Sequence, residues 1–174
     1  CGDHRLEGWW NADLLPSAST DVLANFEQAL PFRSGSVDFL HSEDLLEHLS
    51  RNGGIAFLSE CFRVLRAGGV MRLLTPDLRR LVEKVYWQRD ATHLAWCDRE
   101  LQASGPCEAL NMHLRMNGDH RFVYDEEHLT ATLQRIGFRV RSCRYNESVH
   151  AELRYLDLRN FGLSISLEAE KPGT

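Results

Sequence analysis

The sequence predicts an α/β fold with a doubly wound, mostly parallel sheet, and three neighbouring segments predict it. A short apolar run of strand type extends from Val37 to His41, apolar residues repeat at helical spacing from Ile55 to Arg66, and a second strand-like run extends from Val70 to Leu74. A strand, a helix and a strand joined by a tight glycine turn are typical of a right-handed parallel crossover. The 174 residues suffice for a sizeable core, so we expect residues 1–174 to form a single domain.

The ends of these elements indicate where a ligand binds. We expect Ser42 to Leu49 to form a short helix after the first strand, and Gly68-Gly69 to end the longer helix in a left-handed conformation. On doubly wound sheets, ligands bind beyond the carboxyl ends of the strands. Those ends are His41-Ser42-Glu43 and Thr75-Pro76-Asp77, so functional residues are expected there.

Two further strands are expected before the crossover and a helix after it. Gly8 to Leu14 is strand-like and is ended by Pro16, and Asp21 to Phe26 is a weaker strand candidate. After the second strand of the crossover, we expect Thr75 to cap a helix whose first residue is Pro76.

The C-terminal half is expected to close the fold. Residues 88–118 show mixed periodicity, and we interpret them as a cap or insertion over the cleft, where substrate specificity resides. Asp125 is expected to cap a helix that stops at Gly137. Phe138 to Tyr145 and Leu163 to Ala169 then alternate apolar and polar residues, which predicts an antiparallel hairpin at the edge of the sheet.

Composition narrows the class of protein. The net charge of −5 indicates no general attraction to nucleic acid. No apolar run approaches the roughly 20 residues of a membrane span, so no membrane partner is expected. The five cysteines are odd in number and lack a C-x-x-C pair, and His93 and His113 show no ligand-like spacing. We therefore expect a cytoplasmic protein without a disulfide framework and without a bound metal.

Several motifs occur in order along the first half of the chain: Leu30-Pro31-Phe32, Ser36-Val37-Asp38, Leu46-Glu47-His48-Leu49, and Arg63-Val64-Leu65 before Gly68-Gly69. In this order they resemble the class I S-adenosylmethionine (SAM)-dependent methyltransferases, in particular the methyltransferase type 11-like group. The resemblance implies a Rossmann-like methyltransferase fold with S-adenosyl-L-methionine as cofactor. We interpret the protein as an enzyme that transfers a methyl group from SAM to a small-molecule or carbohydrate-like acceptor.

The resemblance also assigns the start of the chain to the cofactor. Cys1 and Gly2 match the end of the glycine-rich loop, and we expect the strand that leads into this loop to stand before Cys1 or another segment to fill its place. Asp13, followed by Leu14, is implied to accept hydrogen bonds from the ribose hydroxyls. Asp13 lies eleven positions after Gly2, whereas the usual interval is about 20. The alternative for Asp13 is a turn former at the strand end.

The next two strand ends complete the expected cofactor site. The resemblance places the adenine at Asn25 and Phe26, where an amide oxygen can accept from the exocyclic amine. Phe26 could instead be an ordinary core residue. His41 and Ser42 lie nearer the expected methyl group, and we expect their backbone to line the methionine pocket.

Two polar clusters are candidates for the acceptor side. His120, Arg121 and Tyr124 precede a helix, and we expect His120 to take a proton from the acceptor and Arg121 to bind an anionic group. The alternative is a loop satisfied by its own hydrogen bonds. Glu47 and His48 could form a general base or part of a metal site, but adjacent helical residues diverge, so we favour a packing role for His48.

Two other functions stay open. The incomplete glycine loop and short first crossover are compatible with a non-catalytic module that keeps the fold as a partner-binding surface. A nicotinamide-dependent oxidoreductase shares the architecture, but Leu30-Pro31-Phe32 and Leu46-Glu47-His48-Leu49 argue against it.

Overall fold

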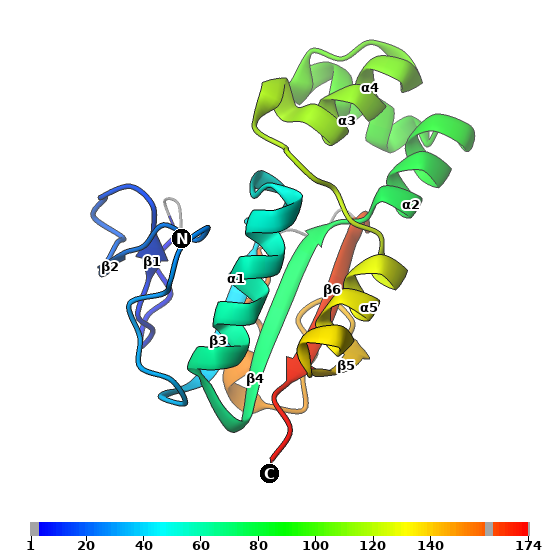
Figure 1. Cartoon of the computed structure of the whole chain (residues 1–174). Coiled ribbons are helices and arrows are strands. Elements are labelled where there is room, and N and C mark those ends of the chain that lie inside the picture. Colours follow the sequence, from blue (N-terminus) through cyan, green and yellow to red (C-terminus); the bar gives the residue numbers. More distant parts are fainter. Residues whose placement is uncertain (1–3, 159–161, 174) are drawn as a thin grey trace.

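In the computed structural model of the chain, which describes residues 4–158 and 162–173, the strands form two sheets (Figure 1). The larger sheet has the order β3-β4-β6-β5, and the smaller one pairs β1 with β2. The strands are β1 (Ala12–Asp13), β2 (Val22–Leu23), β3 (Val37–Glu43), β4 (Leu65–Pro76), β5 (Arg139–Ser142) and β6 (Ser164–Glu170). The α-helices are α1 (Arg51–Val64), α2 (Leu78–Arg80), α3 (Ala91–Leu101), α4 (Gly105–Arg115) and α5 (Glu126–Ile136). Short 3₁₀ turns are η1 (Leu46–His48), η3 (Met116–Gly118) and η4 (Ala151–Leu153), and a π-helical turn, η2 (Leu81–Trp87), continues α2.

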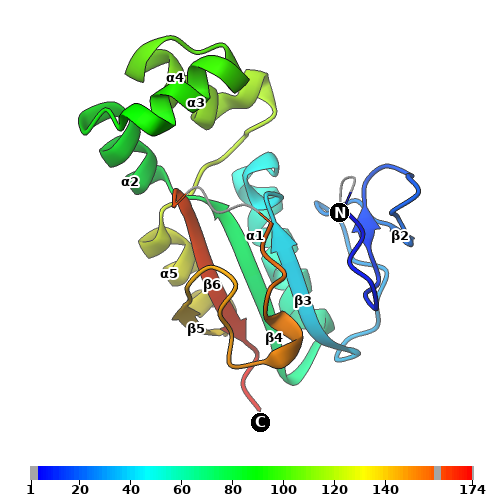
Figure 2. The same cartoon turned by 180° about the vertical axis from the view of Figure 1, so that it is seen from behind.

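The predicted α/β fold class is confirmed. β3 and β4 are parallel and are joined through α1, and β6 adds antiparallel to β4. Helices α1 and α5 lie together on one side of the larger sheet, and the segment that contains η4 crosses the other side (Figures 1 and 2). The main apolar core lies under the two helices, where Leu58 and Leu133 are fully buried together with Met71 and Leu167 of the strands.

The helix of the crossover ends earlier than predicted. Ser50 caps α1 by accepting a hydrogen bond from the Gly53 amide, and the helix stops at Val64 because Leu65 is already extended. Gly68 has a φ of 74°, but it lies within β4, where the pairing with β3 shifts register between Leu65 and Val70, rather than at the helix end. The predicted helix from Ser42 to Leu49 is also wrong, because β3 continues through Glu43 and only η1 follows.

The cap of the helix after β4 is Asp77 and not Thr75. The Asp77 carboxylate accepts from the amides of Arg79 and Arg80. Thr75 and Pro76 are the last residues of β4, since they pair with Ile165 and Ser164 of β6. The pairing with β6 therefore extends the strand by two residues beyond its apolar run.

The predicted C-terminal helix and antiparallel strand pair are confirmed. Asp125 accepts from the His128 amide and begins α5, and Gly137 ends the helix with a φ of 121°. β5 pairs antiparallel with β6 and forms the edge of the sheet. No helix in the described ranges is both long enough and apolar enough to cross a membrane.

The small sheet is attached to the rest of the chain through α1. Its two strands are only two residues each, much shorter than predicted. After β2, the Phe26 ring packs edge-on against Phe57 of α1 at 5.7 Å between centroids. The Glu27 carboxylate accepts from the Ser50 amide at 2.9 Å, and the Leu30 amide donates to Glu60 at 2.8 Å. These contacts hold the small sheet on the β3 side of the larger one (Figures 1 and 2).

Candidate functional site

The small sheet brings two of the predicted cofactor residues to the same edge. β1 and β2 are parallel, with Asp13 in register with Leu23, so both strands end at that edge. The Ala24 amide donates to the Asp13 carbonyl at 2.9 Å, which places Asn25 next to the end of β1. A carboxylate and a side-chain amide from adjacent strands therefore lie at the carboxyl edge of this sheet.

Local contacts show how these two side chains are held. An Asp13 carboxylate oxygen accepts from the Leu15 amide at 3.1 Å, and the Asn25 side-chain oxygen accepts from the Glu27 amide at 3.0 Å. Both residues thus form turns at their strand ends, as in the alternative considered for Asp13. Leu14 is 58% exposed beside Asp13. Cys1 and Gly2, also predicted for the cofactor, lie outside the described residues.

Phe26 contributes to packing. Its ring contacts Phe57 and is partly buried against the main core, which is the ordinary role considered for it in the sequence. The backbone of Phe26 still follows Asn25 directly at the edge of the small sheet.

His41 and Ser42 lie near the end of β3, and their side chains point to opposite sides of the sheet. The His41 Nε2 atom lies 3.6 Å from Asp157 Oδ1, on the side covered by the η4 segment. Ser42 is buried, and in the described part of the chain its hydroxyl has no hydrogen-bond partner. An unpaired buried hydroxyl is uncommon and costly, so Ser42 Oγ marks a polar point at the carboxyl end of β3.

Glu47, His48 and His120 come together beyond β3. Each offers one ligand atom, and these atoms lie within 4.8 Å of one another. Glu47 and His48 were expected to diverge, but their ligand atoms lie within this distance, and His120 approaches them from another segment. His48 Nδ1 also lies 3.2 Å from the Asp119 carbonyl, so the packing role favoured for His48 is present as well.

The backbone of η1 fixes the second polar segment. The Glu47 carbonyl accepts from the amides of Arg121 and Phe122, at 2.8 and 3.2 Å. Glu47 is 1% exposed, and its carboxylate accepts a hydrogen bond from the Thr75 hydroxyl at 2.9 Å. The ends of β3 and β4 are therefore joined to the segment that carries His120 and Arg121.

His120 and Arg121 are held by different partners. His120 Nδ1 lies 2.6 Å from the His113 carbonyl, and burial lowers the pKa of the His120 imidazole. The Arg121 guanidinium donates to Glu27 Oε1 at 3.0 Å, and its side chain is half exposed. Since Glu27 follows β2, Arg121 links the predicted acceptor side to the small sheet.

Tyr124 occupies the core. It is 1% exposed, its hydroxyl contacts Gly54 of α1, and burial raises the pKa of the phenol. Its backbone bridges to Asp77, and its side chain lies against Gly54 under α1. The structure thus brings His120 and Arg121 to the strand ends and separates Tyr124 from them.

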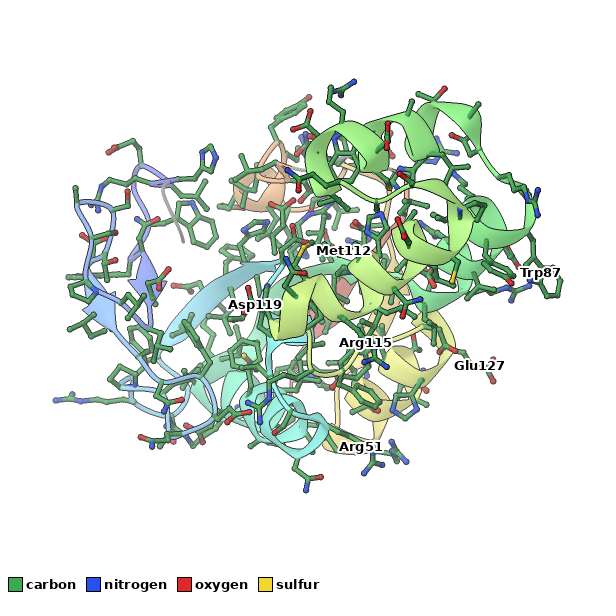
Figure 3. All side chains as sticks on the ribbon, turned by 90° about the horizontal axis from the view of Figure 1, so that it is seen from above. Arg51, Trp87, Met112, Arg115, Asp119 and Glu127 are labelled. Carbon is green, nitrogen blue, oxygen red and sulfur yellow. The ribbon has the colours of Figure 1, made fainter. Side chains whose placement is uncertain are left out.

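The parts around the strand ends are seen from above in Figure 3, where α4 and the turn after it pass over the sheet, with Asp119 on the side of β3. A hollow of about 720 Å³ lies elsewhere, between the start of α2 and α5. It is lined by charges of both signs, including Arg79, Glu83 and Glu126, and by none of the described residues predicted for the site.

The comparisons with known proteins identify the fold. A family model described as a methyltransferase domain matches residues 11–73, which include β1, β2, β3, α1 and most of β4. No curated protein matches the sequence. The fold is that of the class I SAM-dependent methyltransferases, and the resemblance seen in the sequence is confirmed.

Three solved structures illustrate the likeness. A SAM-dependent methyltransferase from Archaeoglobus fulgidus has 13% identity and a TM-score of 0.54, over 88% of this chain and 68% of that one. An O-methyltransferase family protein from Burkholderia thailandensis has 13% identity and a TM-score of 0.52, over 89% of this chain and 36% of that one. A possible histamine N-methyltransferase from Thermotoga maritima has 16% identity and a TM-score of 0.51, over 88% of this chain and 64% of that one. The chain thus spans about a third of one relative and under two thirds of another.

Proposed function

We propose that this chain binds SAM at the carboxyl edge of β1 and β2 and acts in methyl transfer to a small-molecule or carbohydrate-like acceptor. The observation that carries the proposal is the position of Asp13 and Asn25 at adjacent ends of two parallel strands. A carboxylate that accepts from two hydroxyls and an amide oxygen that accepts from an amine are the groups needed for a ribose and an adenine. The residues present therefore fit the cofactor.

Each residue has a separate task in this proposal. Asp13 holds the ribose, Asn25 and the backbone at Phe26 hold the adenine, and the exposed Leu14 side chain offers an apolar surface beside them. The backbone at His41 and Ser42 lies on the path toward the methionine end. When bound, SAM supplies an electrophilic methyl group on a sulfonium. The protein then contributes mainly by holding the acceptor in line with that group.

On the acceptor side we propose His120 and Arg121. Burial favours the neutral form of His120, and a neutral imidazole can accept a proton from an acceptor hydroxyl. Arg121 is half exposed and can bind an anionic group of the acceptor in addition to Glu27. Tyr124, also predicted for this side, supports the segment from the core.

Calorimetric titration of the chain with SAM tests the proposal. Saturable heat together with a thermal shift at millimolar SAM is expected. Asp13→Ala should weaken binding by roughly tenfold or more, since a hydrogen bond to a charged group contributes about 1.5–3 kcal/mol. Asp38→Ala is the matched control, because Asp38 lies at the opposite end of β3 and pairs with Arg66 at the surface. Equal affinities in the two variants would refute the ribose role.

A second candidate function is a non-catalytic module that binds a partner through this fold. The observation in its favour is that, within the described residues, no strand joins β1 to β3, so the two sheets are separate. Absence of SAM binding would favour this module. Titration with nicotinamide cofactors tests the oxidoreductase in the same experiment, and absence of binding would exclude it.

A further inference from the structure

Three side chains with metal-binding atoms meet in the helical cap, away from the strand ends. His93 and Cys97 stand on α3 and His113 on α4, and one ligand atom of each lies within 4.8 Å of the others. His93 Nε2 is 2.8 Å from His113 Nε2, and Cys97 Sγ is 3.6 Å from the same atom. All three potential ligand atoms therefore converge on one point between two helices.

The helices position these side chains by simple geometry. His93 and Cys97 are four residues apart, so they occupy successive turns on one face of α3. Asp90 caps α3 by accepting from the His93 amide at 2.8 Å, which fixes the turn that carries His93. His113 lies in the last turn of α4, next to Met112, which is labelled in Figure 3. The spacing of four between His93 and Cys97 is visible in the sequence, although the two histidines alone show no such pattern.

The surroundings hold the rings in place. The His93 imidazole stacks on Trp96, with centroids 5.5 Å apart, and on His113, with centroids 4.9 Å apart. Cys97 is fully buried, whereas both histidines are partly exposed, so an ion can reach the site from solvent.

The distances are close to those around one tetrahedral ion. Ligands at about 2.0–2.3 Å from zinc lie roughly 3.3–3.6 Å apart, which matches the 3.6 Å between Cys97 Sγ and His113 Nε2. The two histidine nitrogens have to separate by about half an ångström from their present 2.8 Å. In the metal-free protein, one of these nitrogens donates a hydrogen bond to the other.

We propose that His93, Cys97 and His113 bind a zinc ion that joins α3 to α4, with water as the fourth ligand. Two imidazoles and a thiolate are a ligand set that zinc prefers. Binding forms two Zn–N bonds and one Zn–S bond, and the Cys97 thiol releases its proton to solvent. Asp90 and Lys84 are the charged groups that act on His93, and they oppose each other. The site is independent of SAM binding.

The packing of the cap explains what the ion would do. The buried apolar cluster of the cap consists of Leu81, Val85, Cys97, Ala103, Ala109 and Leu163, and three of these six side chains are short. Among the described residues, seven partly buried apolar side chains, including Leu94, Trp96 and Leu110, pack against this cluster. Units of this small size are often stabilised further by a metal. The zinc ion would therefore order α3 and α4 above the strand ends.

Titration of the metal-free full chain with Co²⁺, followed by absorption, tests the proposal. One equivalent of Co²⁺ is expected to give tetrahedral d–d bands and a near-ultraviolet sulfur-to-cobalt band. Cys97→Ala should abolish the sulfur band, and His113→Gln should weaken Co²⁺ binding by at least about tenfold. With Zn²⁺, hydrogen exchange in residues 91–115 should slow in the wild type.

Two controls keep the result interpretable. Cys107→Ala removes an exposed thiol from α4 outside the cluster, and His48→Gln removes a ligand from the Glu47–His48–His120 group. Both should leave the sulfur band unchanged. The far-ultraviolet circular dichroism of Cys97→Ala shows whether it folds, and His113→Gln carries the test if it does not. The proposal would be overturned if the wild-type Co²⁺ spectrum lacked a sulfur band. It would also be overturned if the sulfur band persisted in Cys97→Ala.

Discussion

Arg72 of β4 and Asp157 form an ion pair whose two side chains are fully shielded from solvent, with Arg72 Nε 2.6 Å from Asp157 Oδ1. The same guanidinium donates to the carbonyls of Arg144 and Glu147 and to the carboxylate of Glu168. One buried side chain thus binds the segment that follows β5 to the face of the sheet opposite α1. This contact closes the side of the sheet on which His41 lies.

We expect Asp157→Ala to destabilise the protein strongly. The substitution leaves the Arg72 charge buried with only Glu168 nearby, and breaking a buried pair in this way costs about 3–5 kcal/mol. Urea unfolding followed by circular dichroism measures the loss. Asp38→Ala, which breaks the exposed Arg66–Asp38 pair, is the control and should cost at most about 1 kcal/mol. Similar losses of unfolding free energy in the two variants would show that the buried pair stabilises the protein no more than the exposed pair does.

The same pair predicts how stability depends on pH. Burial opposes ionisation of Asp157, but hydrogen bonds from Arg72 and from the Asn146 amide outweigh it and hold the pKa of Asp157 well below its usual value. A carboxyl whose folded pKa is depressed stabilises the fold above its unfolded pKa of about 4, and this contribution is lost as pH falls further. The urea midpoint should therefore hold between about pH 5 and 7 and fall below about pH 4, with a smaller fall in Asp157→Ala.

Local sequence patterns predicted the parts of the fold that depend on neighbours in the chain. The cap at Asp125 and the end at Gly137 define α5 because each acts within one helical turn. The apolar stripe of α1 was predicted for the same reason. Asp13 and Asn25 were singled out through the family resemblance, and the structure places them near the ends of β1 and β2 at one edge of the small sheet.

Contacts between distant segments could not be predicted in this way. Thr75 was expected to cap a helix, but its pairing with Ile165 keeps it in β4. Arg72 stands within an apolar run, and its burial depends on Asp157, which lies 85 positions later. Tyr124 was assigned with its polar neighbours, yet its bridge to Asp77 turns its side chain into the core. In each case a strand pairing or an ion pair outweighs the local pattern.

The contact between Gly54 and Tyr124 predicts a destabilising effect of a small substitution. A Cβ atom at Gly54 would lie 2.5 Å from the Tyr124 hydroxyl oxygen and 3.3 Å from a Leu46 methyl carbon. In an exposed helix, glycine to alanine stabilises by about 0.5–1 kcal/mol, but overpacking costs about 1–3 kcal/mol. Gly54→Ala should therefore lower the free energy of unfolding in urea. A net gain in stability would show that Tyr124 can move aside.

Tyr124→Phe separates a core role from a role with the acceptor or cofactor. In the described part of the chain no residue hydrogen-bonds the Tyr124 hydroxyl, so its removal relieves an unpaired buried group. We expect the variant to be as stable as the wild type or more stable by about 1 kcal/mol, with unchanged SAM affinity. The double variant Gly54→Ala/Tyr124→Phe should recover the stability lost in Gly54→Ala, because the nearest ring carbon, Cζ, lies 3.7 Å from the new Cβ. A fall in SAM affinity in Tyr124→Phe, or a double variant no more stable than Gly54→Ala, would contradict the assignment of Tyr124 to the core.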